Sequence, residues 1–143
     1  MLYLFDLDGT LISSYMDNPK KDYNTWHVLP GRREKLAKLQ AAGHKIAIIT
    51  NQGGVAHGYY EERHVHDLHA WMQQQLQQHG AHIDAFEHCP YHPEGVVERY
   101  AQESEFRKPQ PGMILKLQRE WTTDPSRSFV VGDRDSDVQA AIA

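Results

Sequence analysis

The stretch Leu2-Tyr3-Leu4-Phe5-Asp6-Leu7-Asp8-Gly9-Thr10 decides the fold class of this 143-residue chain. Four apolar residues followed by an acidic, glycine-containing turn are typical of a short buried strand rather than a helix. Two carboxylates directly after such a strand are costly unless something neutralises them, because close negative charges repel each other. The stretch therefore predicts a buried strand that carries an acidic site at its carboxyl end.

Strand and helix patterns alternate along the rest of the chain. The uninterrupted apolar run Ile46-Ala47-Ile48-Ile49 predicts a strand covered on both faces, as in parallel sheets. We expect further strands at 83–86 and 128–131. Helices are expected from 30–33 to Gly43, over about 61–78, over 111–121 and from 137 to 143. Loops are expected at 11–29 and 88–108. This alternation predicts an α/β fold whose mostly parallel central sheet has helices on both faces.

The composition is that of an ordinary globular protein, with 40% apolar and 24% charged residues. The net charge of −4 disfavours broad, non-specific binding to nucleic acid or to an anionic membrane. Cys89 is the single cysteine, which excludes an intrachain disulfide, and the sequence shows neither a signal peptide nor a membrane-spanning run. We expect one cytoplasmic domain over residues 1–143. An open parallel sheet would normally return with another strand, so a C-terminal truncation stays open.

Polar clusters follow three of the predicted strands: Asp6 and Asp8, Thr50 and Asn51, and residues 133–137. Ligands of open α/β sheets bind at the carboxyl ends of the strands, so these clusters are expected to meet in one crevice. Carboxylates gathered there need a hard divalent cation, and Mg²⁺ prefers a few carboxylate oxygens together with water and phosphate oxygens. The sequence therefore predicts a magnesium site.

Four motifs of this chain resemble, in order, those of the haloacid dehalogenase (HAD) superfamily: Asp6-Leu7-Asp8-Gly9-Thr10, Thr50-Asn51, Lys108 and Gly132-Asp133-x-x-x-Asp137. The branch of heptose bisphosphate and histidinol-phosphate phosphatases is most similar at Thr50-Asn51-Gln52-Gly53, Cys89-Pro90-x-His92-Pro93, Arg107-Lys108-Pro109-x-Pro111-Gly112-Met113 and Gly132-Asp133-Arg134. The resemblance implies a Rossmann-like HAD fold. No insert long enough for a large cap domain follows Asp6 or Thr50.

The resemblance also implies roles for the acidic residues. Asp6 is expected to attack phosphorus and form an aspartyl-phosphate, which divides one difficult hydrolysis into two steps. Asp8 is expected to protonate the leaving oxygen and then to take a proton from the attacking water. Asp6, the backbone carbonyl of Asp8 and Asp133 are the expected Mg²⁺ ligands. Asp137 is expected to position Lys108 or a metal-bound water.

The remaining site residues are expected to bind phosphate or substrate: Thr50, Asn51, Gln52, Gly53, Arg107 and Lys108. The Thr50 hydroxyl and the backbone amides around Asn51 to Gly53 would donate to phosphoryl oxygens, since glycine lets the backbone approach closely. Lys108 would add a compact positive charge near the phosphoryl group. Arg107 could form a forked contact with a second anionic or hydroxylated part of the substrate.

Relatives in the heptose phosphatase branch carry a structural zinc in the loop before Arg-Lys-Pro. The matching positions here are Cys89, Tyr91, Ser104 and Phe106. One ligand of four does not build a structural Zn²⁺ site, so we predict no zinc at these positions. An improvised site from His88, Cys89 and His92 lacks a good fourth ligand and stays an open alternative.

A second group of histidines lies on the predicted helix over 61–78: His64, His66 and His69. His66 and His69 are about one turn apart and could share a face of the helix. The apolar stripe runs through Val65 and Leu68, and no neighbouring carboxylate or cysteine completes a convincing ligand set. We therefore predict surface histidines.

Three functions remain open. The first is a phosphatase acting on a small phosphorylated metabolite, such as a sugar phosphate, a sugar bisphosphate or a compound like histidinol phosphate. Phe5–Thr10, Trp26 and Thr50–Gly53 also resemble the phosphatase half of polynucleotide kinase-phosphatases, which implies a DNA 3′-phosphatase. Lys20 and Lys21 would suit a strand end, but the net negative charge and the missing Walker-type kinase segment count against it. The third is an inactive HAD-fold binding module.

Overall fold

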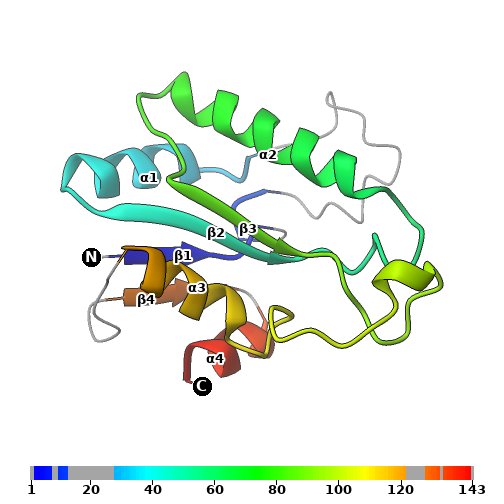
Figure 1. Ribbon diagram of the computed structural model, residues 1–143. Helices are drawn as coiled ribbons and strands as arrows, with labels where there is room; N and C mark the ends of the chain where they lie inside the picture. Colours follow the sequence, from blue (N-terminus) through cyan, green and yellow to red (C-terminus); the bar gives the residue numbers. More distant parts are fainter. Residues whose placement is uncertain (1, 8–9, 13–27, 122–127, 133, 143) are drawn as a thin grey trace.

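The computed structural model describes residues 2–7, 10–12, 28–121, 128–132 and 134–142. Its sheet has four parallel strands in the order β3-β2-β1-β4, as Figure 1 shows. The elements in chain order are β1 (Leu2–Phe5), α1 (Arg32–Ala41), β2 (Lys45–Asn51), α2 (Glu62–Gln77), β3 (Ala85–Cys89), the 3₁₀ helix η3 (Glu98–Tyr100), α3 (Gly112–Trp121), β4 (Ser128–Val131) and α4 (Asp135–Ile142). The alternation predicted from the sequence is confirmed.

The helices form two layers around the sheet. In Figure 1, α1 and α2 lie on one face and α3 and α4 on the other. Each layer has its own apolar core: Leu36, Leu68 and Met72 belong to the first, and Met113 and Leu117 to the second. The sheet between the layers is therefore buried on both faces, as its uninterrupted apolar runs predicted.

Strand register brings the carboxyl ends of the central strands to one edge. Phe5 of β1 pairs with Ile48 of β2 on one side and with Val131 of β4 on the other. The backbone N–H of Asp6 then donates to the carbonyl of Val131 at 2.9 Å, which extends the pairing by one residue. The first acidic residue after β1 is thus fixed beside the end of β4.

The ends of α1 follow from local sequence. Gly43 has a φ of +88°, which is the left-handed conformation expected there. Its N–H donates to the carbonyl of Gln40, and the N–H of His44 donates to that of Leu39. These two hydrogen bonds form a Schellman motif, which ends the helix and returns the chain toward β2.

The apolar stripe of α2 is confirmed, since Val65, Leu68, Met72 and Leu76 are all buried. The expectation of three surface histidines on this helix is wrong for His69. That side chain is 6% exposed, and its ring stacks on Phe86 with centroids 4.5 Å apart. The buried face of α2 is thus wider than its aliphatic residues alone indicate, because an aromatic partner on β3 covers the imidazole.

The third strand differs from the predicted 83–86, since β3 begins at Ala85 and extends to Cys89. Ile83 is buried, but its N–H and carbonyl are bonded to the side chain of Gln73 on α2, at 2.7 and 2.9 Å. Pairing with β2 starts only after Asp84, whose N–H and carboxylate bond the backbone of Ile46. The backbone N–H and carbonyl of Ile83 are therefore hydrogen-bonded to a glutamine of the facing helix and not to β2.

The segment expected as a loop over 88–108 includes the end of β3 and the helix η3, and α4 begins at Asp135 rather than at Asp137.

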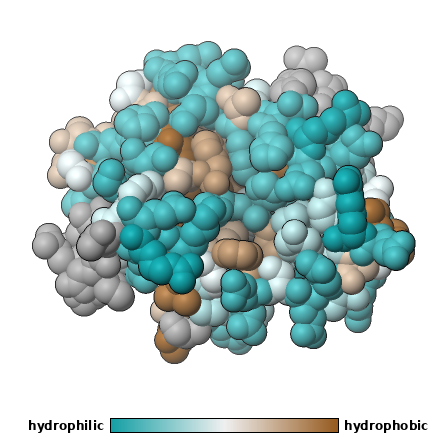
Figure 2. All heavy atoms as spheres, viewed as in Figure 1, coloured by the Kyte–Doolittle hydropathy of each residue, from teal (hydrophilic) through white to brown (hydrophobic). Residues whose placement is uncertain are grey.

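The face shown in Figure 2 is mostly hydrophilic, with hydrophobic atoms near its lower edge, where α4 lies. Among the described residues, no helix combines the length and the apolar character needed to cross a membrane.

Candidate active site

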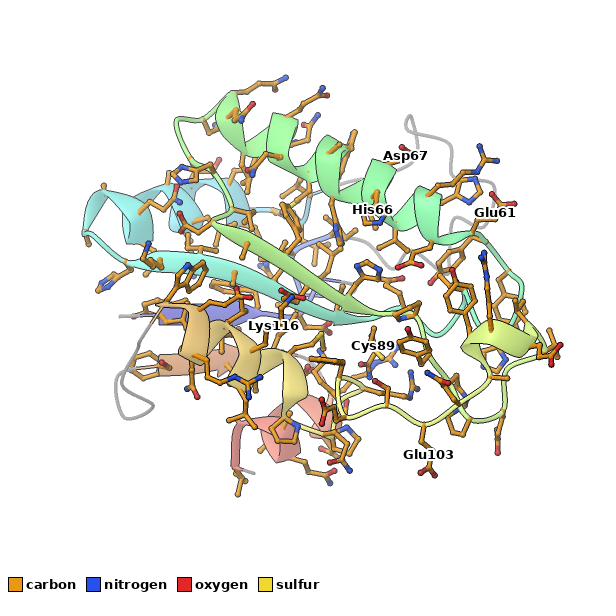
Figure 3. The ribbon with its side chains drawn as sticks, viewed as in Figure 1. Glu61, His66, Asp67, Cys89, Glu103 and Lys116 are labelled. Atoms are coloured by element: carbon orange, nitrogen blue, oxygen red, sulfur yellow. The ribbon has the colours of Figure 1, made fainter. Side chains whose placement is uncertain are left out.

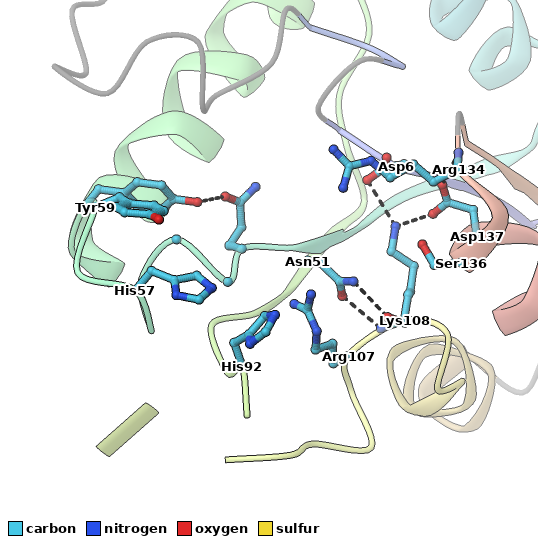
Figure 4. Close-up of a pocket in the computed structure, with 14 residues that line it drawn as sticks. Asp6, Asn51, His57, Tyr59, His92, Arg107, Lys108, Arg134, Ser136 and Asp137 are labelled. Atoms are coloured by element: carbon cyan, nitrogen blue, oxygen red, sulfur yellow. Dashed lines mark hydrogen bonds and ion pairs between the residues drawn. The ribbon is translucent and has the colours of Figure 1, made fainter. Parts of the chain in front are cut away.

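Lys108 is the centre of the site, as Figure 4 shows. It is 4% exposed, and its ammonium group donates to the carbonyl of Ile49 at 3.0 Å and to the Asp6 carboxylate at 3.1 Å. A third hydrogen bond goes to the Asp137 carboxylate. Each ammonium hydrogen therefore has an acceptor, and the contact expected between Asp137 and Lys108 is present. Burial rules out Lys108 as a solvated loop charge.

Asn51 fixes the backbone of Lys108. The Asn51 side-chain amide donates to the Lys108 carbonyl at 3.0 Å, and its oxygen accepts from the Lys108 N–H at 2.9 Å. This pair of bonds ties the end of β2 to a residue 57 positions away in the chain. The side chain of Asn51 therefore has a positioning role, which the sequence did not indicate.

Asp6 lies at the end of β1 and is 6% exposed. Its pKa is raised from 3.8 to about 6, chiefly because burial removes solvent from the carboxylate. Lys108 counteracts this increase, and the second carboxylate, Asp137, adds to it. Asp6 and Asp137 share one lysine, so this group of three side chains has one more negative than positive charge, which a cation would relieve.

The carboxylates of Asp6 and Asp137 line a cavity of about 220 Å³. Its lining is Asp6, Asn51, Gln52, Gly53, Gly54, His57, Tyr59, Tyr60, His92, Arg107, Lys108, Arg134, Ser136 and Asp137. The guanidinium of Arg107 is half-buried there, and its Nη1 is a buried nitrogen without a hydrogen-bond partner among the described residues. An unpartnered, buried cationic donor in a polar cavity is suited to an anionic ligand.

The turn after β2 places the backbone of Gly53 close to the guanidinium of Arg107. A Cβ on Gly53 would lie 3.1 Å from Nη1 of Arg107, and one on Gly54 would lie 2.4 Å from the Tyr60 ring. Neither residue can be replaced without a shift of its neighbours. The two glycines thus allow the backbone to lie close to Arg107 and Tyr60, while its approach to a phosphoryl oxygen stays a prediction.

One expectation about this turn needs correction, whereas the phosphate-binding role of Thr50 stays a prediction. The backbone N–H of Gln52 already donates to the Cys89 carbonyl at 2.8 Å, so it is not available to a phosphoryl oxygen. Thr50 is fully buried and is not among the described residues that line the cavity. Its hydroxyl accepts from the Gln52 amide at 3.0 Å, and Tyr60 donates to the Gln52 oxygen at 2.6 Å. Gln52 therefore supports the turn through its side chain.

Several predicted residues lie outside the described part of the chain, namely Asp8, Asp133 and the loop residues Lys20, Lys21 and Trp26. The structure brings together Asp6, Asn51, Gln52, Gly53, Arg107, Lys108 and Asp137. The cavity is also lined by residues to which sequence reasoning assigned no role, namely His57, Tyr59, Tyr60, Arg134 and Ser136, and by His92, which it considered only as a metal ligand. Arg134 and Ser136 could have been found from their position inside the last acidic motif.

The improvised metal site from His88, Cys89 and His92 is wrong. Successive residues of β3 point to opposite faces of the sheet: His88 bonds Glu62 of α2, whereas Cys89 packs with Met113 and Leu117 of α3. His92 lies in the cavity instead.

The four positions aligned with the zinc ligands of relatives do gather. Tyr91 and Phe106 pack against the apolar cluster that contains Cys89, and the Ser104 hydroxyl accepts from the backbone N–H of Phe106 at 3.1 Å. Burial raises the pKa of the Cys89 thiol, which disfavours the thiolate that a metal would need. The absence of zinc at these positions stays a prediction.

The pattern of the polynucleotide kinase 3 phosphatase family matches residues 1–140. The chain belongs to this family. It shares the fold of HAD phosphatases and is a phosphatase of that superfamily, as its four motifs indicated.

The chain is similar to named phosphatases of bacteria. It is 44% identical to the D-glycero-beta-D-manno-heptose-1,7-bisphosphate 7-phosphatase of Rhodopseudomonas palustris, over 96% of this chain and 76% of that protein. It is 43% identical to a D-glycero-alpha-D-manno-heptose-1,7-bisphosphate 7-phosphatase of Burkholderia mallei, over 78% of this chain and 59% of that protein.

A solved structure is similar as well. The D,D-heptose 1,7-bisphosphate phosphatase of B. bronchiseptica, complexed with magnesium and phosphate, is 31% identical, with a TM-score of 0.85 over 99% of this chain and 74% of that one. The chain thus spans part of the length of each relative.

Proposed function

We propose that this protein is a Mg²⁺-dependent phosphatase that hydrolyses a phosphomonoester of a small sugar bisphosphate through an aspartyl-phosphate. The observation that carries the proposal is the buried Asp6 carboxylate, held by Lys108 at the base of a cavity that Arg107 and Arg134 also line. A nucleophilic carboxylate in a cationic cavity is the arrangement that phosphoryl transfer from a dianionic ester requires.

The residues present fit Mg²⁺. Asp6 is a hard oxygen donor whose raised pKa reflects burial that one shared lysine does not offset, and a divalent cation would supply the missing charge. Asp6, Asp8 and Asp133 are the residues proposed to hold it. When bound, Mg²⁺ neutralises charge on the phosphoryl oxygens and orients the phosphate.

The chain's own residues supply the remaining chemistry. An oxygen of Asp6 attacks phosphorus while the bond to the ester oxygen breaks, and Asp8 gives its proton to the leaving alkoxide. Asp8 then takes a proton from water, which attacks the aspartyl-phosphate and releases inorganic phosphate and free Asp6. Lys108 keeps Asp6 oriented for both steps, and Asp137 keeps Lys108 in place.

The choice of substrate rests on two observations. The names of the relatives support a heptose 1,7-bisphosphate, and the cavity has a second cationic position at Arg107, apart from the paired Lys108. Arg107 Nη1 is without a partner among the described residues, so it suits a second anionic group of the substrate.

The test is phosphate release with Mg²⁺ from the α and β anomers of D-glycero-D-manno-heptose 1,7-bisphosphate and from a 3′-phosphorylated oligonucleotide. We expect release from at least one heptose bisphosphate and its disappearance in Asp6→Asn. Preference for the oligonucleotide would instead support the DNA 3′-phosphatase that the family's name describes. A folded wild type that is inert on all three substrates would support a binding module.

A further inference from the structure

A cluster of ligand-type side chains lies between α2 and β3, away from the cavity. Glu62 and His66 are one helical turn apart on α2, and His88 lies on β3 beneath them. Figure 3 shows His66 on the part of α2 that lies above the end of β3, where Cys89 is labelled. None of the three residues lines the cavity that contains Asp6.

The spacing of these three side chains suits a single metal ion. One ligand atom from each residue lies within 4.8 Å of the others, and Nε2 of His88 is 2.8 Å from Oε1 of Glu62. Donor atoms on one Zn²⁺ lie roughly 3 to 4 Å apart, because each metal–ligand bond is about 2 Å long. Small rotations of the exposed His66 and of its neighbours would therefore close the site.

The surroundings prepare the ligands. The second carboxylate oxygen of Glu62 accepts a hydrogen bond from the Tyr100 hydroxyl at 2.8 Å, which orients the carboxylate as an outer-shell partner does in metal sites. The rings of His66 and His88 meet edge to face, with centroids 5.3 Å apart. Both rings therefore already face the same space.

A third imidazole, that of His69, lies beside the cluster. His69 is buried, its ring centroid is 5.8 Å from that of His88, and its Nε2 is a buried nitrogen without a hydrogen-bond partner among the described residues. A buried imidazole with an unpartnered nitrogen is an unusual feature for a purely structural core.

We propose that Glu62, His66 and His88 bind a divalent transition metal ion of the Zn²⁺ class, with water in the remaining coordination position. Two imidazoles and one carboxylate are the ligand set that such ions favour over Mg²⁺. The ion would join the first turns of α2 to the end of β3 and, through Tyr100, to the segment after β3. This site is distinct from the four loop positions for which we predict no zinc.

The test is a titration of the full chain with Co²⁺ in excess Mg²⁺, followed by the visible absorption that reports the ligand geometry of Co²⁺, and repeated with Zn²⁺ by calorimetry. We expect one such ion per chain and at least tenfold weaker binding in His66→Gln and in Glu62→Gln. His79→Gln is the matched control, because His79 is an exposed histidine at the far end of the α2 region. Its affinity should equal that of the wild type.

Three results would overturn the proposal: no stoichiometric binding by the wild type, unchanged affinity in His66→Gln, or loss of binding in His92→Gln, which would place the ion in the cavity. Because His66 is exposed, its replacement is not expected to impair folding, and circular dichroism of each variant checks this.

Discussion

Asp137, on the short helix α4, connects Lys108 to the backbone of Arg134. It is buried, it accepts from Lys108, and one of its oxygens also accepts from the backbone N–H of Arg134 at 3.2 Å. Because Lys108 also holds Asp6, a change at Asp137 affects the proposed nucleophile without touching it. Asp137 is therefore a positioning residue.

We expect Asp137→Asn to lower kcat at least tenfold and to reduce the free energy of unfolding by about 2 kcal/mol, because hydrogen bonds to charged groups contribute about 1.5–3 kcal/mol. Steady-state phosphatase kinetics and denaturant unfolding measure the two effects. Asp135→Asn, on the exposed side of the same helix, should change neither. Equal losses in the two variants would contradict the positioning role.

The pKa of Asp6 predicts how pH and Mg²⁺ act together. Since its pKa in the folded protein, about 6, lies above the ordinary 3.8, the folded state keeps a proton that the unfolded chain has released. The stabilising contribution of that proton is complete below the ordinary pKa and is lost as the pH rises through the folded value. Mg²⁺ would compete with the proton for the same carboxylate.

We therefore expect Mg²⁺ to raise the melting temperature more at about pH 7.5 than at about pH 5, where Asp6 is protonated. Thermal unfolding with and without Mg²⁺ at both pH values measures the difference. In Asp6→Asn the dependence should shrink, and an Mg²⁺ effect independent of pH in the wild type would count against Asp6 as a ligand.

At the scale of elements, the turn from β4 into α4 is built around a glycine. A Cβ on Gly132 would lie 2.2 Å from the Asp137 carboxylate, so no larger residue fits without moving that group. Gly43, after α1, has open space around it and requires glycine only for its positive φ. A substitution of Gly132 therefore tests displacement of the Asp137 side chain, whereas a substitution of Gly43 tests only the strain of a positive φ.

Gly132→Ala should reduce phosphatase activity by an order of magnitude or more, because it displaces Asp137 and with it Lys108. Gly43→Ala should lower the free energy of unfolding by about 1 kcal/mol through left-handed strain and leave kcat unchanged. Kinetics and denaturant unfolding of both variants test this pair of expectations. A Gly132→Ala enzyme with full activity would show that Asp137 has room to move.

How well the sequence predicted each element depended on where its determinants lie. β1, β2 and β4 were found from local apolar runs, and the C-terminal end of α1 from Gly43. The start of β3 could not be found, because a side chain of α2, Gln73, occupies the backbone of Ile83. The burial of His69 was missed for the same reason, since its stacking partner Phe86 is on another element.

At the scale of the whole molecule, the described sheet ends in an edge strand, β4, with Phe129 and Val131 partly exposed. Strand edges with apolar side chains favour pairing between molecules. We expect Phe129→Lys to reduce concentration-dependent self-association of this chain, measured by sedimentation velocity. Val96→Lys, an equally drastic change at an exposed position in the segment after β3, should have no such effect. Equal behaviour of the two variants would exclude the β4 edge as the contact.

The site itself was predictable as a set of motifs but not as a set of bonds. The sequence indicated that Asp6, Thr50 with Asn51, and residues 133–137 converge at one edge, because parallel strands present their carboxyl ends together. Lys108 was added by the resemblance to the HAD superfamily. The sequence did not indicate that Asn51 bonds the backbone of Lys108 or that Gln52 has its amide committed to Cys89. Those partners depend on how the long connection after β3 returns to β2, which no local pattern encodes.

The three acceptors of the Lys108 ammonium come from residues 6, 49 and 137. During synthesis, the first of them leaves the ribosome more than a hundred residues before the last. A nascent chain can therefore form most of the described sheet while the ammonium of Lys108 still lacks one of its three acceptors. We therefore expect phosphatase activity to require the docking of α4, because that helix supplies the last of the three acceptors to be synthesised.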